Sequence, residues 1–133
     1  MVPPAPPRAR AVHAILVLML FSSFLLVQGA APPGEKVLVV ELEMDIDAGA
    51  EELVRRAISY ASSRPGEVAA LILQINTDGG YVSTMYRIVD LISGCLTKVV
   101  AFVPPGGRCF SAGAYVFMAC DTTAMAPGTS IGA

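Results

Sequence analysis

The chain has 133 residues, of which 54% are hydrophobic and 15% are charged, and its formal net charge is −2. This length predicts one globular domain rather than several. The slight acidic excess argues against nucleic acid as a partner, because phosphate binding requires a basic patch and none is visible in the sequence.

The N-terminal segment has the composition of an export signal. Residues 1–10 are rich in proline and carry Arg8 and Arg10, residues 14–27 are apolar and uncharged, and residues 28–31 include small side chains. The apolar run is shorter than the roughly 20 residues that a membrane-spanning helix needs. We therefore expect residues 1–31 to be a cleaved signal peptide, with an uncleaved signal-anchor as the alternative. Residues 32–133 would then form an extracytoplasmic domain, secreted or held at the membrane.

Three cysteines, Cys95, Cys109 and Cys120, fall in this exported part of the chain. Their number is odd and no C-x-x-C pair occurs, so the sequence predicts no metal site. We expect small buried thiols. One disulfide, or a reactive Cys109, remains an alternative in an oxidising compartment.

The apolar pattern alternates between strands and helices along the mature domain. It predicts strands at 36–44, 68–75, 98–103 and from 123 onward, and helices at 48–63, from about 81 to 93, and at 111–119. This order, βαβαβαβ, predicts an α/β fold with a parallel sheet. The strand at 68–75 is nearly all apolar, which is typical of a strand covered on both faces. Residues 104–110 are predicted to be a tight loop, and no closing element is predicted in residues 128–133.

Two segments at the carboxyl ends of predicted strands could carry chemistry. Ser111 stands where a loop enters a helix, and unpaired amides at a helix N-terminus favour developing negative charge. Ser111 on its own would more simply be a helix cap. Gly79 and Gly80 follow the strand at 68–75, where backbone amides could point at an oxyanion. The glycine pair on its own would be an ordinary turn, with Asp78 capping the next helix. Neither a P-loop nor a dinucleotide fingerprint is present, so no cofactor is predicted.

Taken together, these segments resemble the Clp-type serine peptidases of the crotonase-like superfamily, and most closely their membrane-associated NfeD branch. The matching motifs are N-T-D-G-G at residues 76–80, S-A-G-A-Y at 111–115 and M-A-P-G-T-S-I-G-A at 125–133. The resemblance implies a ββα-superhelix of successive βα units, of which this chain would be the N-terminal portion. It also implies a hydrolase with Ser111 as the nucleophile of a Ser-Lys dyad, and an oxyanion hole formed by the backbone amides of Gly79, Gly80 and Ala112.

The same resemblance implies partners and a setting. Such peptidases form dimers or larger homo-oligomers beside stomatin-like membrane proteins, whose apolar tails are their expected substrates. The chain departs from the family at Asp78, where the motif has proline, because a carboxylate there would oppose negative charge in the oxyanion hole.

No general base is predicted in this chain. His13, the only histidine, belongs to the leader, and Lys36 and Lys98 begin strands at the edge opposite the proposed active site. In the family the lysine follows the M-A-P-G-T segment, so we expect a truncated chain with little or no activity.

Two other functions remain open. A noncatalytic peptide-binding or assembly module would use the same cleft, and a crotonase-like acyl-CoA site would use the same glycine amides. Arg108 is expected to be a solvated loop residue, although it could bind a substrate carboxylate. The pairs Glu51–Arg55 and Glu52–Arg56 have the spacing of ordinary surface ion pairs on a helix.

Overall fold

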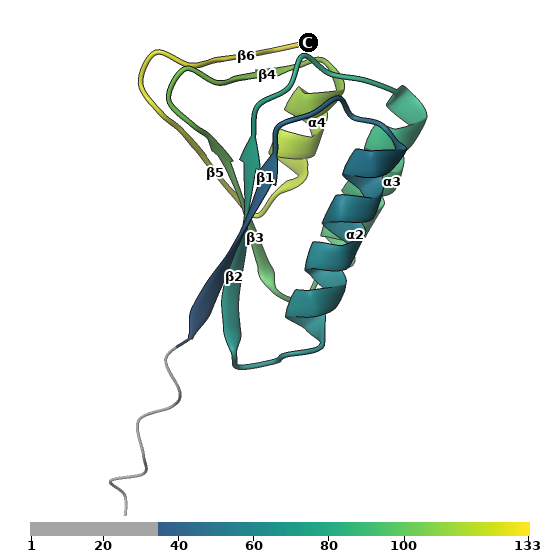
Figure 1. Ribbon diagram of the computed structural model, residues 1–133, viewed down its shortest axis with the longest axis vertical. Coiled ribbons are helices and arrows are strands. Elements are labelled where there is room, and N and C mark those ends of the chain that lie inside the picture. The colour runs from purple at the N-terminus through teal and green to yellow at the C-terminus, as the bar shows by residue number, and fades with distance from the viewer. Residues whose placement is uncertain (1–34) are drawn as a thin grey trace, which may run out of the picture. The chain divides into compact units, whose positions relative to one another are not determined.

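The computed structural model describes residues 35–133, and the expected leader at residues 1–31 lies outside them (Figure 1). The elements are β1 (Lys36–Leu42), α2 (Ala48–Ser62), β2 (Val68–Ile75), α3 (Val82–Ser93), β3 (Lys98–Val103), β4 (Arg108–Phe110), α4 (Ala112–Ala119), β5 (Thr122–Met125) and β6 (Ser130–Gly132). The predicted α/β class is confirmed, and each predicted strand and helix is present within a few residues of its expected bounds.

The main sheet contains four parallel strands in the order β1-β2-β3-β5. Because the strands are parallel, their carboxyl ends meet at one edge, from which the loops leave toward the helices (Figure 1). The two segments singled out in the sequence, residues 76–80 and the start of α4, follow β2 and β4. The topology therefore assembles the candidate site at this edge.

Within residues 35–133 the three helices cover one face of the sheet. Alternate side chains such as Leu71, Leu73 and Val99 are buried beneath them. The side chains that point to the opposite face are less covered, and Val37 and Val39 of β1 are more than half exposed. In β2, the strand for which cover on both faces was expected, the residues of this opposite face, Ala70, Ile72 and Gln74, are half-buried, so within the described region the expectation holds only in part.

Helix α2 shows why its sequence folds as it does. The Asp47 carboxylate accepts hydrogen bonds from the amides of Gly49 and Ala50 at 2.8 and 3.1 Å, which satisfies two of the free donors at the helix N-terminus. The buried stripe of the helix then follows the 3.6-residue period: Ala50, Val54, Ala57, Ile58 and Ala61. The predicted pairs Glu51–Arg55 and Glu52–Arg56 are confirmed on its surface, and Arg87 of α3 joins Glu51 at 2.6 Å.

The segments at 104–110 and 128–133 differ from prediction. Both contain short strands, and β4 pairs in parallel with β6 in the register Arg108↔Ser130, Cys109↔Ile131, Phe110↔Gly132. These strands lie side by side above the main sheet (Figure 1). Three-residue strands are too short to show a period in the sequence, and these two depend on pairing with each other and, for β4, with Thr77.

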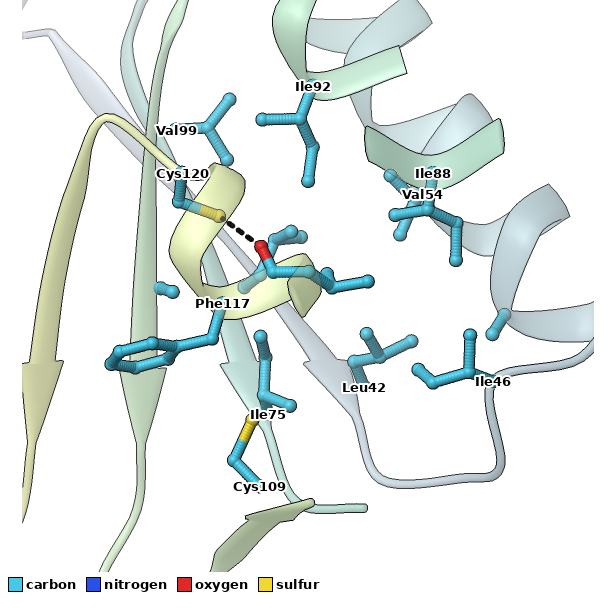
Figure 2. Close-up of a cluster of buried hydrophobic side chains, with 14 of the residues drawn as sticks. Leu42, Ile46, Val54, Ile75, Ile88, Ile92, Val99, Cys109, Phe117 and Cys120 are labelled. Carbon is cyan, nitrogen blue, oxygen red and sulfur yellow. Dashed lines mark hydrogen bonds between the residues drawn. The ribbon is translucent and has the colours of Figure 1, made fainter. Parts of the chain in front are cut away.

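The core lies between the main sheet and the helices (Figure 2). Cys109 and Cys120 are buried in it, all three cysteines are free thiols, and the Cys120 thiol donates to the carbonyl of Val116 at 3.4 Å. Burial raises the pKa of Cys109 to about 11 and that of Cys120 to about 12. Thiolate is therefore scarce near neutral pH. Buried thiols are confirmed for these two residues, and the disulfide and the reactive Cys109 are not found.

None of the helices in residues 35–133 combines the length and the apolar character needed to cross a bilayer.

Candidate functional site

The loop after β2 is fastened to β4, the strand that leads into Ser111. The amide of Thr77 donates to the carbonyl of Arg108 at 2.8 Å, and the amide of Phe110 donates to the carbonyl of Thr77 at 3.0 Å. The amide of Arg108 also donates to the Asn76 side-chain oxygen at 3.2 Å. These bonds hold the glycine pair and the serine in one fixed arrangement, although about 30 residues separate them in sequence.

Ser111 and Gly79 are in close contact. A Cβ atom added to Gly79 would lie 2.7 Å from the Ser111 Cβ and 3.2 Å from its Oγ, and the φ of Gly79 is +120°. Only glycine fits here without moving the serine. The structure therefore brings together the two segments that the sequence singled out separately.

The backbone of Ser111 is strained. Its φ of 51° and ψ of −122° make it the only non-glycine residue with a positive φ in residues 35–133. Such a conformation costs about 1–3 kcal/mol and persists only where the surroundings enforce it. Here the Ser111 amide donates to the carbonyl of Gly132 at 2.7 Å, which anchors the turn to β6.

Ser111 occupies the N-cap position of α4, but its side chain makes no capping hydrogen bond. The simpler interpretation, a helix-capping serine, is therefore wrong. Ser111 is also exposed to solvent. The hydroxyl thus lies at the turn between β4 and α4 and does not cap the helix.

The amides near Ser111 differ in their bonding. The Gly79 amide donates to Thr77 Oγ1 at 3.1 Å, whereas within residues 35–133 the amides of Gly80 and Ala112 have no hydrogen-bonded acceptor. Gly80 is itself fixed against residue 46, because the Ile46 amide donates to Gly79 O at 2.7 Å and the Tyr81 amide donates to Ile46 O at 2.8 Å. Within the described residues two backbone donors, one in the glycine loop and one directly after Ser111, are therefore without an acceptor.

Thr77 is a site residue that the sequence analysis missed. It is buried, its hydroxyl donates to Gly79 O at 3.3 Å while accepting from the Gly79 amide, and its methyl group lies where a side chain on Gly113 would collide. Thr77 belongs to the N-T-D-G-G motif, but nothing in the sequence shows that its side chain bonds to Gly79.

Asp78 and Arg108 form an ion pair across the two segments. Arg108 Nε contacts Asp78 Oδ1, and Nη2 contacts Oδ2 at 2.8 Å. The hydrogen bond to Arg108 lowers the pKa of the Asp78 carboxyl, and the bond to Asp78 raises the pKa of Arg108. Asp78 does not cap α3, whose N-cap is Tyr81 without a side-chain bond, so that expectation is wrong. Arg108 is solvent-exposed as expected, but it begins β4 rather than lying in a loop, and it is paired with Asp78.

The two lysines of the described region lie away from Ser111, as predicted. Lys36 pairs with Glu67 at 2.9 Å and Lys98 with Asp121 at 3.4 Å, both at the amino-terminal ends of their strands. No lysine or histidine in residues 35–133 is therefore placed to take a proton from Ser111, and His13 lies outside this region.

A cavity of about 260 Å³ runs beside the site. Polar residues dominate its lining, which consists of Glu43, Met44, Asp45, Asn76, Thr77, Asp78 and Arg108. It borders the glycine loop and does not include Ser111.

Comparison with known proteins relates this geometry to a family. The profile of the family described as "NfeD1b, N-terminal domain" matches residues 36–133. The membrane-bound protease PH1510 of Pyrococcus horikoshii is 35% identical over 118 residues, which cover 86% of this chain and 26% of that protein. The membrane protein NfeD1b of Bacillus subtilis is 32% identical over 120 residues, which cover 90% of this chain and 26% of that protein.

Solved structures show the same fold. A lysine-to-alanine mutant of the 1510-N membrane-bound stomatin-specific protease, in complex with a substrate peptide, superposes with a TM-score of 0.70 at 34% identity. The match covers 74% of this chain and 45% of that one. A ClpP1 mutant from Listeria monocytogenes has a TM-score of 0.55 at 23% identity, with 62% of this chain and 46% of that one covered, and it shows the fold alone.

This chain thus spans about a quarter of the length of its curated relatives and about half of the solved chains. The family profile nevertheless matches nearly all of the described region, including the glycine loop and Ser111. The protein belongs to the NfeD1b N-terminal domain family and has a Clp-protease-like fold.

Proposed function

We propose that this protein is a serine endopeptidase of the exported or membrane-associated kind, in which Ser111 is the nucleophile. The strained conformation of Ser111 carries the proposal, because it places a hydroxyl with no capping role against Gly79. The amides of Gly80 and Ala112, in the two segments that meet there, have no acceptor within residues 35–133 and support the proposal. Strain of this kind is concentrated at functional sites.

In the proposed reaction the Ser111 oxygen attacks the carbonyl carbon of a peptide bond, and its proton passes to a base. The carbonyl oxygen becomes an oxyanion that accepts hydrogen bonds from the amides of Gly80 and Ala112, ideally at about 3 Å. The sequence analysis also assigned the amide of Gly79 to the oxyanion hole, but this amide already donates to Thr77 Oγ1. In the proposal Gly79 contributes instead by its lack of a side chain, which leaves room beside Ser111. The acyl-enzyme that forms is then hydrolysed by water.

The general base of this proposal is a lysine that residues 35–133 do not supply. A Ser-Lys dyad is supported by the relatives, since the protease with the bound substrate peptide was solved as a lysine-to-alanine mutant. A serine without its base loses orders of magnitude in rate. We therefore expect the 133-residue chain to hydrolyse peptides very slowly.

The substrates in this proposal are apolar segments of membrane-associated proteins. The relatives named as a membrane-bound protease and a stomatin-specific protease support a stomatin-like partner and a location at the membrane. Tyr115 of α4, four residues after Ser111, is 50% exposed and offers an aromatic ring to an apolar peptide. Assembly into a homo-oligomer belongs to the same proposal.

Hydrolysis of a fluorogenic apolar peptide by the purified chain tests the assignment. We expect slow cleavage that rises when imidazole is added as an external base, and no such cleavage by Ser111→Ala. The assignment fails if Ser111→Ala cleaves as fast as the wild type. If the wild-type chain binds the peptide and imidazole produces no cleavage, the function is that of a noncatalytic binding module. This second candidate is favoured by the absence of a lysine or histidine beside Ser111 in residues 35–133.

A further inference from the structure

Asp78 brings a negative charge to a site that is proposed to stabilise one. It directly precedes Gly79, whose backbone contacts Ser111, and it lies on the loop that carries the amide of Gly80. An unpaired carboxylate here would disfavour an oxyanion bound to the same loop, since like charges repel over such distances unless water and salt screen them.

Arg108 is held where its guanidinium can pair with the Asp78 carboxylate. Its amide donates to Asn76 Oδ1 at 3.2 Å and its carbonyl accepts from the Thr77 amide at 2.8 Å, so its backbone is tied to the same loop. Its guanidinium then meets both carboxylate oxygens of Asp78, in the bidentate geometry that arginine forms best. The arginine is thus fixed by the strand that ends at the nucleophile.

We infer that Arg108 is a positioning residue that neutralises Asp78 and so keeps the oxyanion site available for negative charge. The inference rests on the proposed function, because it concerns the oxyanion that Ser111 would generate. It also explains how the loop accommodates an acidic residue beside the glycine pair. Arg108 acts through the charge of Asp78, so its loss should matter less once Asp78 has no charge. If Arg108 only held the loop in place, its loss would matter equally with or without that charge.

A peptide boronate tests the inference without a general base, because it reports an equilibrium. The Ser111 oxygen bonds to boron and its proton goes to the solvent, which leaves a tetrahedral boron with one negative charge in the place of the oxyanion. We would use a tripeptide of leucines ending in a boronic acid and measure its affinity by calorimetry, with boron NMR to confirm the tetrahedral adduct. Ser111→Ala serves as the variant that cannot form it.

The expected results differ between the single and double variants. Arg108→Gln leaves Asp78 unpaired and should weaken boronate binding by about three- to tenfold at low ionic strength, with the loss shrinking below about twofold near 1 M salt. Asp78→Asn should bind at least as tightly as the wild type. The double variant Asp78→Asn with Arg108→Gln should recover most of the loss, because the opposing charge is gone.

A matched control is Arg56→Gln, which breaks a comparable exposed ion pair with Glu52 on α2 and should leave boronate affinity unchanged. Thermal unfolding of each variant verifies that it is folded. The inference is overturned if the double variant binds as weakly as Arg108→Gln, which is the behaviour of a structural clamp, or if all variants bind like the wild type. Failure of the wild-type chain to form any tetrahedral adduct would instead overturn the proposed function, and the inference with it.

Discussion

Ser111 shows how far a single residue can be interpreted from sequence and where geometry is needed. Its position before an apolar helix fits a cap more simply than a nucleophile. The structure argues against the cap, because the side chain forms no cap bond, and it shows a strained backbone at this residue. Neither the missing cap bond nor the strained backbone can be predicted from the sequence.

Gly79 should not tolerate a side chain. In Gly79→Ala the added Cβ would meet Ser111, and the φ of +120° is strained for alanine, so we expect the free energy of unfolding to fall by about 2–4 kcal/mol. Gly106→Ala is the matched control, because its φ is +75° and nothing lies within 4 Å of the new Cβ, so only about 1 kcal/mol of strain is expected. Urea denaturation measures both. Equal losses would show that Gly79 is not in contact with Ser111.

The Asp78–Arg108 pair should make stability depend on pH in acid. Because Arg108 lowers the pKa of Asp78 in the folded protein, the pair stabilises the fold above the ordinary value of 3.8, and its contribution is lost as the pH falls through the lowered value. In Arg108→Gln we expect the Asp78 pKa, measured by carboxyl NMR titration, to return toward 3.8. The stability difference between the variant and the wild type should be small above pH 5 and vanish at the lowest pH. An unchanged Asp78 pKa would mean that the pair does not form in solution.

At the scale of elements, prediction succeeded where a segment has a clear apolar pattern, either a continuous run or a helical period. The bounds of β2 and β3 are those expected, and α2 and α4 differ by one residue. Prediction failed for β4 and β6, which are three residues each and are stabilised by pairing with one another. The candidate site was found in part: Ser111 and the glycine pair followed from motifs, whereas Thr77 and the Asp78–Arg108 pair depend on contacts between segments about 30 residues apart.

Strand β6 should hold Ser111 in place. A variant that ends at Thr129 loses β6 and with it the bond from the Ser111 amide to Gly132. We expect the Ser111 amide to exchange its hydrogen much faster, while amides in β2 and β3 keep their protection. Hydrogen exchange by NMR measures this. An unchanged Ser111 rate would show that β6 is not needed for the strained turn, and loss of protection throughout would show that β6 instead stabilises the whole sheet.

The layer arrangement of the described region makes its two sheet faces unequal. Leu73 of β2 is fully buried beneath the helices, whereas Val39 of β1 is 54% exposed on the other face. Leu73→Ala should lower the free energy of unfolding by about 2–5 kcal/mol. Val39→Ala should change it by about 0.5 kcal/mol or less, as measured by chemical denaturation. A large loss from Val39→Ala would show that this face is covered in solution.

At the scale of the described region, the fold brings two motifs that are far apart in the sequence to one place. The loop after β2 leaves the sheet at one edge, where Thr77 pairs with β4 and so holds the turn after β4 beside it, and the lysines lie at the other edge. The relatives extend well beyond the span shared with this chain. The described region therefore holds the residues proposed as nucleophile and oxyanion donors, and no lysine within it lies near them.

The central claim is that Ser111, among all serines of the domain, is a nucleophile. It is tested most directly by mapping the site of fluorophosphonate modification by mass spectrometry, with imidazole present to accept the proton as fluoride leaves the phosphorus. We predict one modified residue, Ser111, and no modification of Ser111→Ala. Absence of label at Ser111, or label spread equally over exposed serines such as Ser83 and Ser130, would contradict the account.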